Sequence, residues 1–68
     1  MGYTVGIMQR GRFVTSLSTV NRGQAFDHAK KLASLGAVGL ITHDHPDHPK
    51  SYRVYLRPTK GFYIERTV

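Results

Sequence analysis

The stretch NRGQAFDHAKKLASLG, residues 21–36, has the helical period that decides how the rest of the chain can fold. Its apolar residues recur at steps of three and four, the spacing that places side chains on one face of an α-helix. This face consists of Ala25, Phe26, Ala29, Leu32 and Ala33. We therefore predict a helix over residues 22–35.

Both ends of the predicted helix carry the residues that usually begin and end helices. Asn21 is a good N-cap, and Gln24 three residues later gives the spacing of a capping box. Gly36 supplies a residue that tolerates the left-handed conformation in which many helices end. The three alanines of the apolar face have short side chains, so we expect the helix to lie close on a sheet.

Two strands are predicted before the helix. Tyr3, Val5 and Ile7 alternate with small or polar residues, which is typical of a strand over residues 3–9 with one buried face. Residues 13–17 alternate again after a glycine, so we expect a hairpin that turns at Gly11.

Three more strands are predicted after the helix. Residues 37–41 are mostly apolar and fit a central strand that is covered on both faces. Residues 52–57 alternate strictly, and a turn bracketed by Pro58 and Gly61 leads to a last strand over residues 62–67. The fold class is therefore α+β: a single small domain over residues 1–68, β-β-α-β-β-β, with a mainly antiparallel sheet and one helix packed on one face.

One helix cannot cover five strands, so part of the sheet must meet water or another chain. If Tyr52, Val54 and Leu56 point under the helix, their neighbours point away from it. Those neighbours are Arg53, Tyr55 and Arg57, and Tyr63 is expected to join them from the next strand. Aromatic rings interleaved with arginines are typical of sheets that bind single-stranded nucleic acid, although both residues are also common on any exposed strand.

Composition narrows the class of protein. The chain has 68 residues, no cysteine, and ten Lys and Arg against four Asp and Glu, which gives a formal net charge of +6. A domain this small buries only about 60% of the surface that its unfolded chain exposes. We therefore expect a homodimer, joined through sheet edges or open faces, to add to its stability. The charge favours an acidic partner. No apolar run is long enough to span a membrane and no signal peptide is recognised, so we expect a cytoplasmic protein with no membrane partner.

A second cluster of chemically active residues lies in THDHPDHP, residues 42–49, which holds three of the four histidines. His43, His45, Asp47 and His48 offer the imidazole and carboxylate groups that zinc and related ions prefer. The alternative is a polar turn in which the prolines stop the strand and the histidines are solvated.

This segment resembles the H-x-H-x-D-H loop of metallo-β-lactamase-type hydrolases, which also follows an apolar strand. The resemblance implies that His43 and His45 would hold one metal ion, and Asp47 and His48 a second, with a bridging hydroxide as nucleophile. It covers about ten residues, and the later His and Asp ligands and the long four-layer sandwich of that family are missing from this chain. We therefore retain only a single-ion site without catalysis as the metal hypothesis and assign no family.

Lys60, Gly61 and Phe62 also resemble the start of the ribonucleoprotein motif of RNA-recognition domains. That resemblance implies RNA binding on a sheet, but Tyr63 stands where the family has a small residue, and the second helix of that fold is missing. We do not assign the chain to that family either.

Two functional hypotheses follow, and neither is an enzyme, because no serine has the context of a nucleophile and no glycine-rich run precedes the helix. In the first, the protein binds nucleic acid through Arg53, Tyr55, Arg57 and Tyr63, with Arg10 and Arg12 reaching phosphates, and needs no cofactor. In the second, it is a compact inhibitor or accessory protein of viral or mobile-element type that grips an acidic protein.

Overall fold

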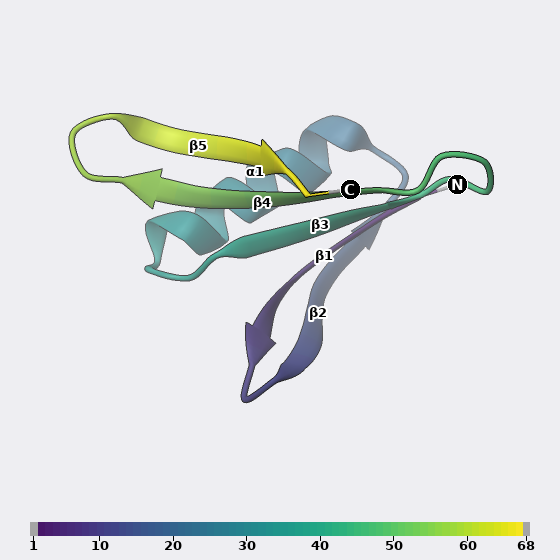
Figure 1. Cartoon of the computed structure of the whole chain (residues 1–68), viewed down its shortest axis with the longest axis horizontal. Coiled ribbons are helices and arrows are strands. Elements are labelled where there is room, and N and C mark those ends of the chain that lie inside the picture. The colour runs from purple at the N-terminus through teal and green to yellow at the C-terminus, as the bar shows by residue number, and fades with distance from the viewer. Residues whose placement is uncertain (1, 68) are drawn as a thin grey trace.

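A computed structural model describes residues 2–67 as one five-stranded sheet with one helix on one face (Figure 1). The predicted order β-β-α-β-β-β is confirmed. The elements are β1 (Gly2–Gln9), β2 (Arg12–Thr19), α1 (Arg22–Ser34), β3 (Gly39–Asp44), β4 (Lys50–Arg57) and β5 (Gly61–Arg66).

All neighbouring strands of the sheet are antiparallel and follow the order β2-β1-β3-β4-β5. The prediction that the strand after the helix is central is therefore confirmed, because β3 lies between β1 and β4. It begins two residues later than predicted and extends past the predicted end at residue 41, through His43 and Asp44. These two residues pair with Tyr3 and Gly2 of β1, and this pairing extends the strand.

The helix begins as predicted, but its capping box is not closed. The Asn21 side chain accepts a hydrogen bond from the Gln24 amide at 2.9 Å, as an N-cap should. The Gln24 side chain instead accepts from the Thr19 hydroxyl, which itself accepts from the Asn21 amide. Thr19 thus takes the bond that a capping box gives to glutamine. At the other end Gly36 is left-handed, with φ at 93°, as predicted.

The core is small and depends on close approach of helix and sheet. Ala25, Ala29 and Ala33 are buried on the face of the helix that packs against the sheet, as predicted from their size. Opposite them the largest fully buried side chains are Ile41, Val5 and Val54, from the three central strands. Burial of a valine or isoleucine stabilises a fold by about 1.5–3 kcal/mol, so this core is modest.

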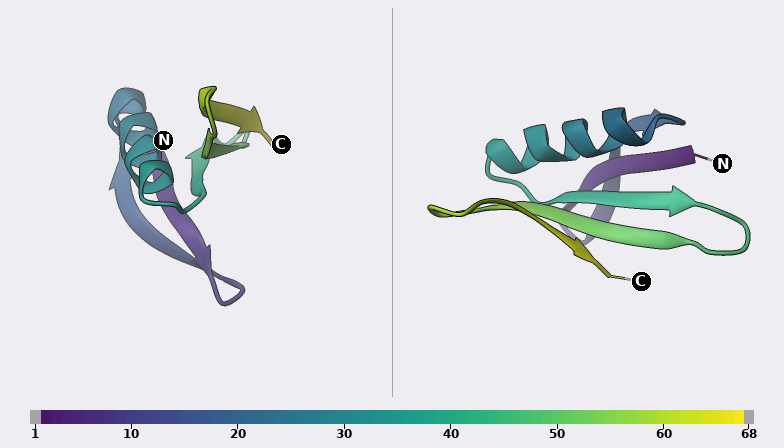
Figure 2. Two further views of the ribbon diagram at one scale, coloured as in Figure 1. Left: turned by 90° about the vertical axis from the view of Figure 1, so that its left-hand side faces the viewer. Right: turned by 90° about the horizontal axis from the view of Figure 1, so that it is seen from above.

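The helix packs over β1, β2, β3 and β4 and leaves the helix-side surface of β5 uncovered (Figure 2). Tyr52 and Val54 point under the helix, as predicted; Tyr52 packs edge-to-face against Phe26, and Val54 is buried. Leu56 continues the alternation on the same side but stays 49% exposed. Leu56 thus faces the helix side, as predicted, but lies at the margin of the core, beside Ala33 and Ser34.

The β1–β2 hairpin turns at Arg10 and Gly11, as predicted. Both residues have positive φ, 54° and 78°, which defines the type I′ turn that suits the twist of a hairpin. A bulge between Val5 and Gly6 shifts the register. Gly6 lies so close to the β2 backbone that a Cβ there would be 2.0 Å from the Val14 carbonyl oxygen.

The helix of the described region is too short and too polar to cross a bilayer.

Candidate nucleic-acid interface

The side of the sheet that faces away from α1, here called the open face, carries the residues singled out on β4 and β5. The register places Tyr55 opposite Tyr63, and Arg53 opposite Glu65. Because successive residues of a strand point to opposite sides, these four side chains and Arg57 lie opposite the buried Val54. The predicted orientation of Arg53, Tyr55, Arg57 and Tyr63 thus agrees with the observed register.

Tyr55, Tyr63 and Arg57 form a cluster at one end of the open face. The two tyrosine rings lie with centroids 5.3 Å apart and planes tilted by 49°. The Arg57 guanidinium lies over the Tyr63 ring, 4.5 Å from its centroid, within the range of a cation–π contact. All three residues are half-buried, so each keeps part of its surface in contact with solvent.

Arg57 also has an unusual polar feature. Its Nε atom is buried and finds no hydrogen-bond partner among the described residues. A buried donor without a partner costs about 1–3 kcal/mol.

Arg53 is not the unpaired cation that the strand pattern suggests. It donates a hydrogen bond to the Glu65 carboxylate across the β4–β5 pair, and the two form an ion pair. The side chains remain 51% and 35% exposed, so the pair is open to solvent and worth about 1 kcal/mol or less. Sequence analysis missed Glu65, although the alternation of the last strand places it on the same side as Tyr63.

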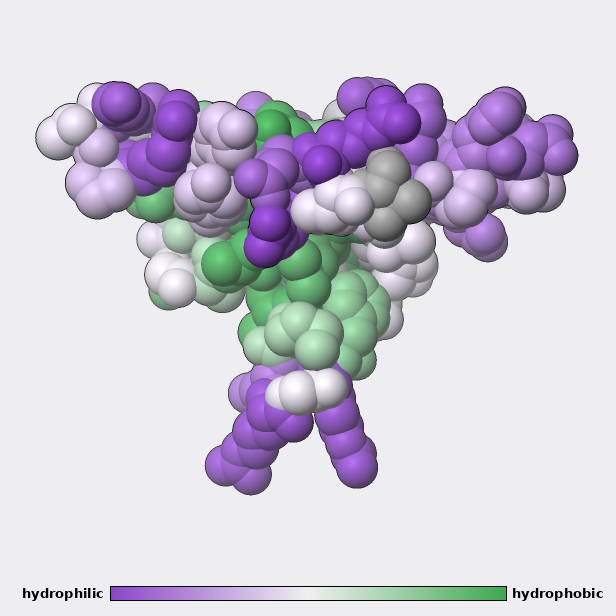
Figure 3. Space-filling model, in the orientation of Figure 1, coloured by the Kyte–Doolittle hydropathy of each residue, from purple (hydrophilic) through white to green (hydrophobic). Residues whose placement is uncertain are grey.

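Arg10 and Arg12 lie apart from the tyrosine cluster, at the exposed tip of the β1–β2 hairpin. The hairpin leans away from the helix (Figure 2), and hydrophilic side chains project from its tip (Figure 3). The two predicted groups of cationic residues thus lie at separate places on the molecule, one at the hairpin tip and one beside the tyrosine cluster. A ligand that touches both must be extended.

An apolar patch separates these two groups (Figure 3). Met8, Val38 and Leu40 line a hollow beside Arg53, with a volume of about 350 Å³. Met8 is 54% exposed, and the Phe13 ring lies over Gly6 next to it. The sequence analysis did not identify this patch, because its members come from three separate segments that only the sheet register brings together.

The histidine-rich segment, residues 42–49, makes contacts within itself and with β1. The His43 ring stacks on Tyr3, with centroids 4.3 Å apart and planes within 9°. The His45 Nδ1 atom accepts hydrogen bonds from the amides of Asp47 and His48, at 3.1 and 3.2 Å. These bonds make His45 the residue that shapes the turn.

The four candidate metal ligands His43, His45, Asp47 and His48 are close in sequence but are not gathered into a ligand set. Within residues 2–67, no group of three or more His, Cys, Asp or Glu side chains is arranged to hold a metal ion. The His45 and His48 rings stack on one another, with centroids 5.7 Å apart. The polar-turn alternative describes this geometry better than the metal hypothesis does.

A serine–histidine pair on the helix side was not anticipated. The Ser16 hydroxyl and the His28 Nε2 atom are 2.7 Å apart and link β2 to α1. The pair lies at the exposed surface, where it fastens the helix to the edge strand. It contributes to the attachment of the β1–β2 hairpin rather than to the open face.

Comparison with protein-family models, curated proteins and solved structures finds no match to this chain.

Proposed function

We propose that this protein is a small basic binding module, without enzymatic activity, that binds single-stranded nucleic acid through the open face. The observation that carries the proposal is the cluster of Tyr55, Tyr63 and Arg57 on the side of the sheet that the helix leaves uncovered. Aromatic rings can stack on any base, and such stacking contributes about 1–3 kcal/mol per base.

Charge supports the same proposal. The open face and the hairpin tip carry Arg10, Arg12, Arg53 and Arg57. The carboxylates on the open face are Glu65, which is paired with Arg53, and Asp44, which alternates with the buried Ile41 at the end of β3. Phosphates would be contacted mainly at the hairpin tip and at Arg57, because Arg53 is already paired. Each phosphate contact releases counterions, so the association constant should fall steeply as salt is added. For a single strand, its logarithm should fall by about 0.7 per phosphate contact for each tenfold rise in salt concentration.

The apolar patch favours a second candidate. Met8, Phe13 and Val38 are each more than a third exposed beside the tyrosine cluster. An acidic protein with an apolar contact surface would use both features, as an inhibitor or accessory protein of viral or mobile-element type would. A homodimer that covers the patch would bury the same residues and compete with nucleic acid.

The test is a fluorescence-anisotropy titration with short single-stranded and duplex oligonucleotides at low and near-physiological salt. The variant Tyr55→Leu/Tyr63→Leu removes the rings and keeps apolar side chains on the strands. Lys31→Gln, on the exposed side of the helix, is the control for net charge.

We expect salt-sensitive binding that prefers single strands, a loss of about tenfold or more in affinity in the tyrosine variant, and little change in Lys31→Gln. A loss in Lys31→Gln with none in the tyrosine variant, whose net charge is unchanged, would show that only the net charge matters. No binding to any oligonucleotide would overturn the proposal and leave the protein-partner candidate. Sedimentation of the free protein would show whether a dimer covers the patch.

A further inference from the structure

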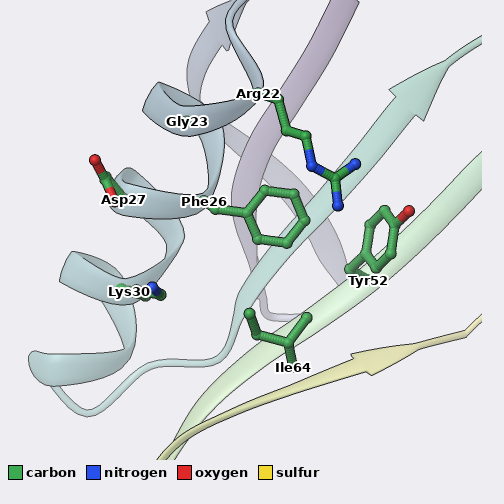
Figure 4. A pocket seen from close by; sticks show the side chains of 7 residues that line it. All are labelled: Arg22, Gly23, Phe26, Asp27, Lys30, Tyr52 and Ile64. Atoms are coloured by element: carbon green, nitrogen blue, oxygen red, sulfur yellow. The ribbon is translucent and has the colours of Figure 1, made fainter.

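A groove on the other side of the molecule lies between α1 and the last two strands (Figure 4). Its apolar floor is formed by Phe26 from the helix, Tyr52 from β4 and Ile64 from β5. The Phe26 and Tyr52 rings pack edge-to-face with centroids 5.3 Å apart. Ile64 remains 44% exposed because the helix does not reach β5. The groove has a volume of about 440 Å³, large enough for an apolar side chain and its flanking backbone.

Cationic residues line the helix side of this groove. The Arg22 guanidinium lies 4.8 Å from the centre of the Phe26 ring and points toward Tyr52 (Figure 4). Side-chain hydrogen bonding with the Tyr3 and Tyr52 hydroxyls raises the pKa of this guanidinium. Lys30 lines the groove two helical turns further on. Asp27 is the one acid at the groove, and its carboxylate points away from the floor.

The groove runs beside an unpaired strand edge. Within residues 2–67, β5 pairs only with β4. The Thr67 amide donates to the Ser51 carbonyl at 2.8 Å, which sets the alternation of hydrogen-bonded pairs along these two strands. By that alternation the backbone groups of Phe62 and Ile64 point outward, to the unpaired edge. Ile64 therefore offers its side chain to the groove and its N–H and C=O to an incoming strand.

The spacing of the cations matches an extended chain. Arg22 and Lys30 are eight residues apart in the helix, which corresponds to about 12 Å at 1.5 Å per residue. Two residues four apart in a strand are separated by about 13 Å and point to the same side. Carboxylates at these two strand positions would meet both cations, and the residue midway between them would face the floor of the groove.

We propose that the groove and the β5 edge together bind an extended acidic segment of another protein, which adds to the sheet as a further strand. The segment has the pattern acid-x-apolar-x-acid, with its apolar side chain between Phe26 and Ile64 and its acids at Arg22 and Lys30. Main-chain hydrogen bonds to β5 supply affinity, and the groove supplies specificity.

Two other occupants fit less well. A second copy of this chain offers four acidic residues, and of these only Asp44 and Glu65 lie in strands, where neither has an acid four residues away. The sugar–phosphate backbone of nucleic acid has no N–H donors, so it cannot add to the strand edge as a further strand. The site is separate from the open face, so the inference does not depend on the proposed function.

The test uses a fluorescein-labelled, capped peptide with glutamate, threonine, leucine, threonine and glutamate at its centre. Anisotropy gives its affinity for the full chain, and NMR amide shifts locate it. Two further peptides replace the glutamates by lysines or carry N-methyl groups on the backbone amides that would pair with β5. Protein variants are Arg22→Gln/Lys30→Gln and Lys30→Gln alone, with Lys31→Gln as a control that removes the same charge outside the groove.

We expect about a tenfold loss of affinity in the double variant, a smaller loss in Lys30→Gln and little change in Lys31→Gln. The lysine and N-methyl peptides should bind far more weakly, and shifts should centre on Phe62, Ile64 and the first half of α1. The inference is overturned by no binding, by equal losses in Lys30→Gln and Lys31→Gln, or by full binding of the N-methyl peptide. Shifts centred on Tyr55 and Tyr63 would overturn it as well. If Arg22→Gln unfolds the chain, the Lys30→Gln comparison still decides the result.

Discussion

Gly39 of β3 touches the backbone of Ala29 in α1, with no side chain between them: a Cβ built at Gly39 would lie 2.6 Å from the Ala29 carbonyl oxygen. This contact sets the distance between helix and sheet, and so the depth of the core. The alanines of the helix and Gly39 of the strand therefore act together, because both allow the helix to pack close to the sheet.

Gly39→Ala should be among the most destabilising single substitutions in the chain. The added methyl group meets backbone rather than a flexible side chain, so the helix must move, and we expect a loss of about 1–3 kcal/mol or more in the free energy of unfolding. Urea denaturation measures it. Gly36→Ala is the comparison: it adds a methyl group in open space and incurs only the strain of its positive φ, about 1–2 kcal/mol. A smaller effect at Gly39 than at Gly36 would contradict this account.

Asn21→Ala should lower the free energy of unfolding by about 1 kcal/mol, because the Gln24 amide loses the side-chain oxygen that caps the helix. Ser34→Ala is the control at the other end, where the hydroxyl only bonds back to the Lys31 carbonyl, and should have a much smaller effect. Thermal and urea unfolding followed by circular dichroism would measure both. Equal effects of the two substitutions would show that the cap is not important for stability.

The order and type of the elements could be predicted because the relevant signals are local. The alanine spacing, Asn21, Gly36 and the alternation around Val54 each act within a few residues and agree with one another. The role of Thr19 was not anticipated. Its hydroxyl takes the place of the Gln24 side chain as acceptor of the Asn21 amide, and it can do so only because β2 ends beside the N-terminus of the helix. The end of β3 was mistaken because His43 and Asp44 become a strand only by pairing with β1.

The candidate site was predicted in part for a similar reason. Alternation alone places Tyr55 and Arg57 on one side of the sheet, so the tyrosine cluster could be anticipated. The pairing of Arg53 with Glu65 depends on the register of β5 against β4, which a single sequence does not specify. The groove depends on how far the helix extends over the sheet, and this is a property of packing that the period of the helix does not reveal.

Arg22 should stabilise the fold equally throughout the neutral pH range. The Tyr3 and Tyr52 hydroxyls raise the pKa of its guanidinium in the folded state. A group with a raised pKa contributes its full stability below its unfolded-state pKa and loses it as pH rises through the folded-state pKa. For an arginine that loss lies at strongly alkaline pH. The difference in urea midpoint between wild type and Arg22→Gln should therefore be constant across neutral pH; a difference that changes there would implicate another group.

Glu65→Gln should strengthen binding of single-stranded nucleic acid. The substitution removes the one carboxylate of the β4–β5 open face and releases Arg53 from its ion pair. We expect one additional phosphate contact. The logarithm of the association constant should then fall by about 0.7 more for each tenfold rise in salt concentration. Stability should fall by about 1 kcal/mol or less, because the pair is exposed. Anisotropy at several salt concentrations measures the change, with Asp27→Asn on the helix as the charge-matched control. A weaker complex in Glu65→Gln would argue against contact at Arg53.

Arg10→Asn should separate stability from binding. Arg10 occupies the first central position of a type I′ turn with φ at 54°, a conformation in which asparagine before glycine is strongly preferred. We therefore expect the free energy of unfolding to rise by about 0.5–1 kcal/mol, since asparagine adopts the left-handed conformation with less strain than arginine. The same change removes a cation from the hairpin tip, so nucleic-acid affinity and its salt dependence should both fall. Arg12→Gln lies on the strand just past the turn and should lower affinity without the gain in stability. If Arg10→Asn stabilises the chain and leaves affinity unchanged, the hairpin tip does not contact phosphate, and binding is confined to the tyrosine cluster.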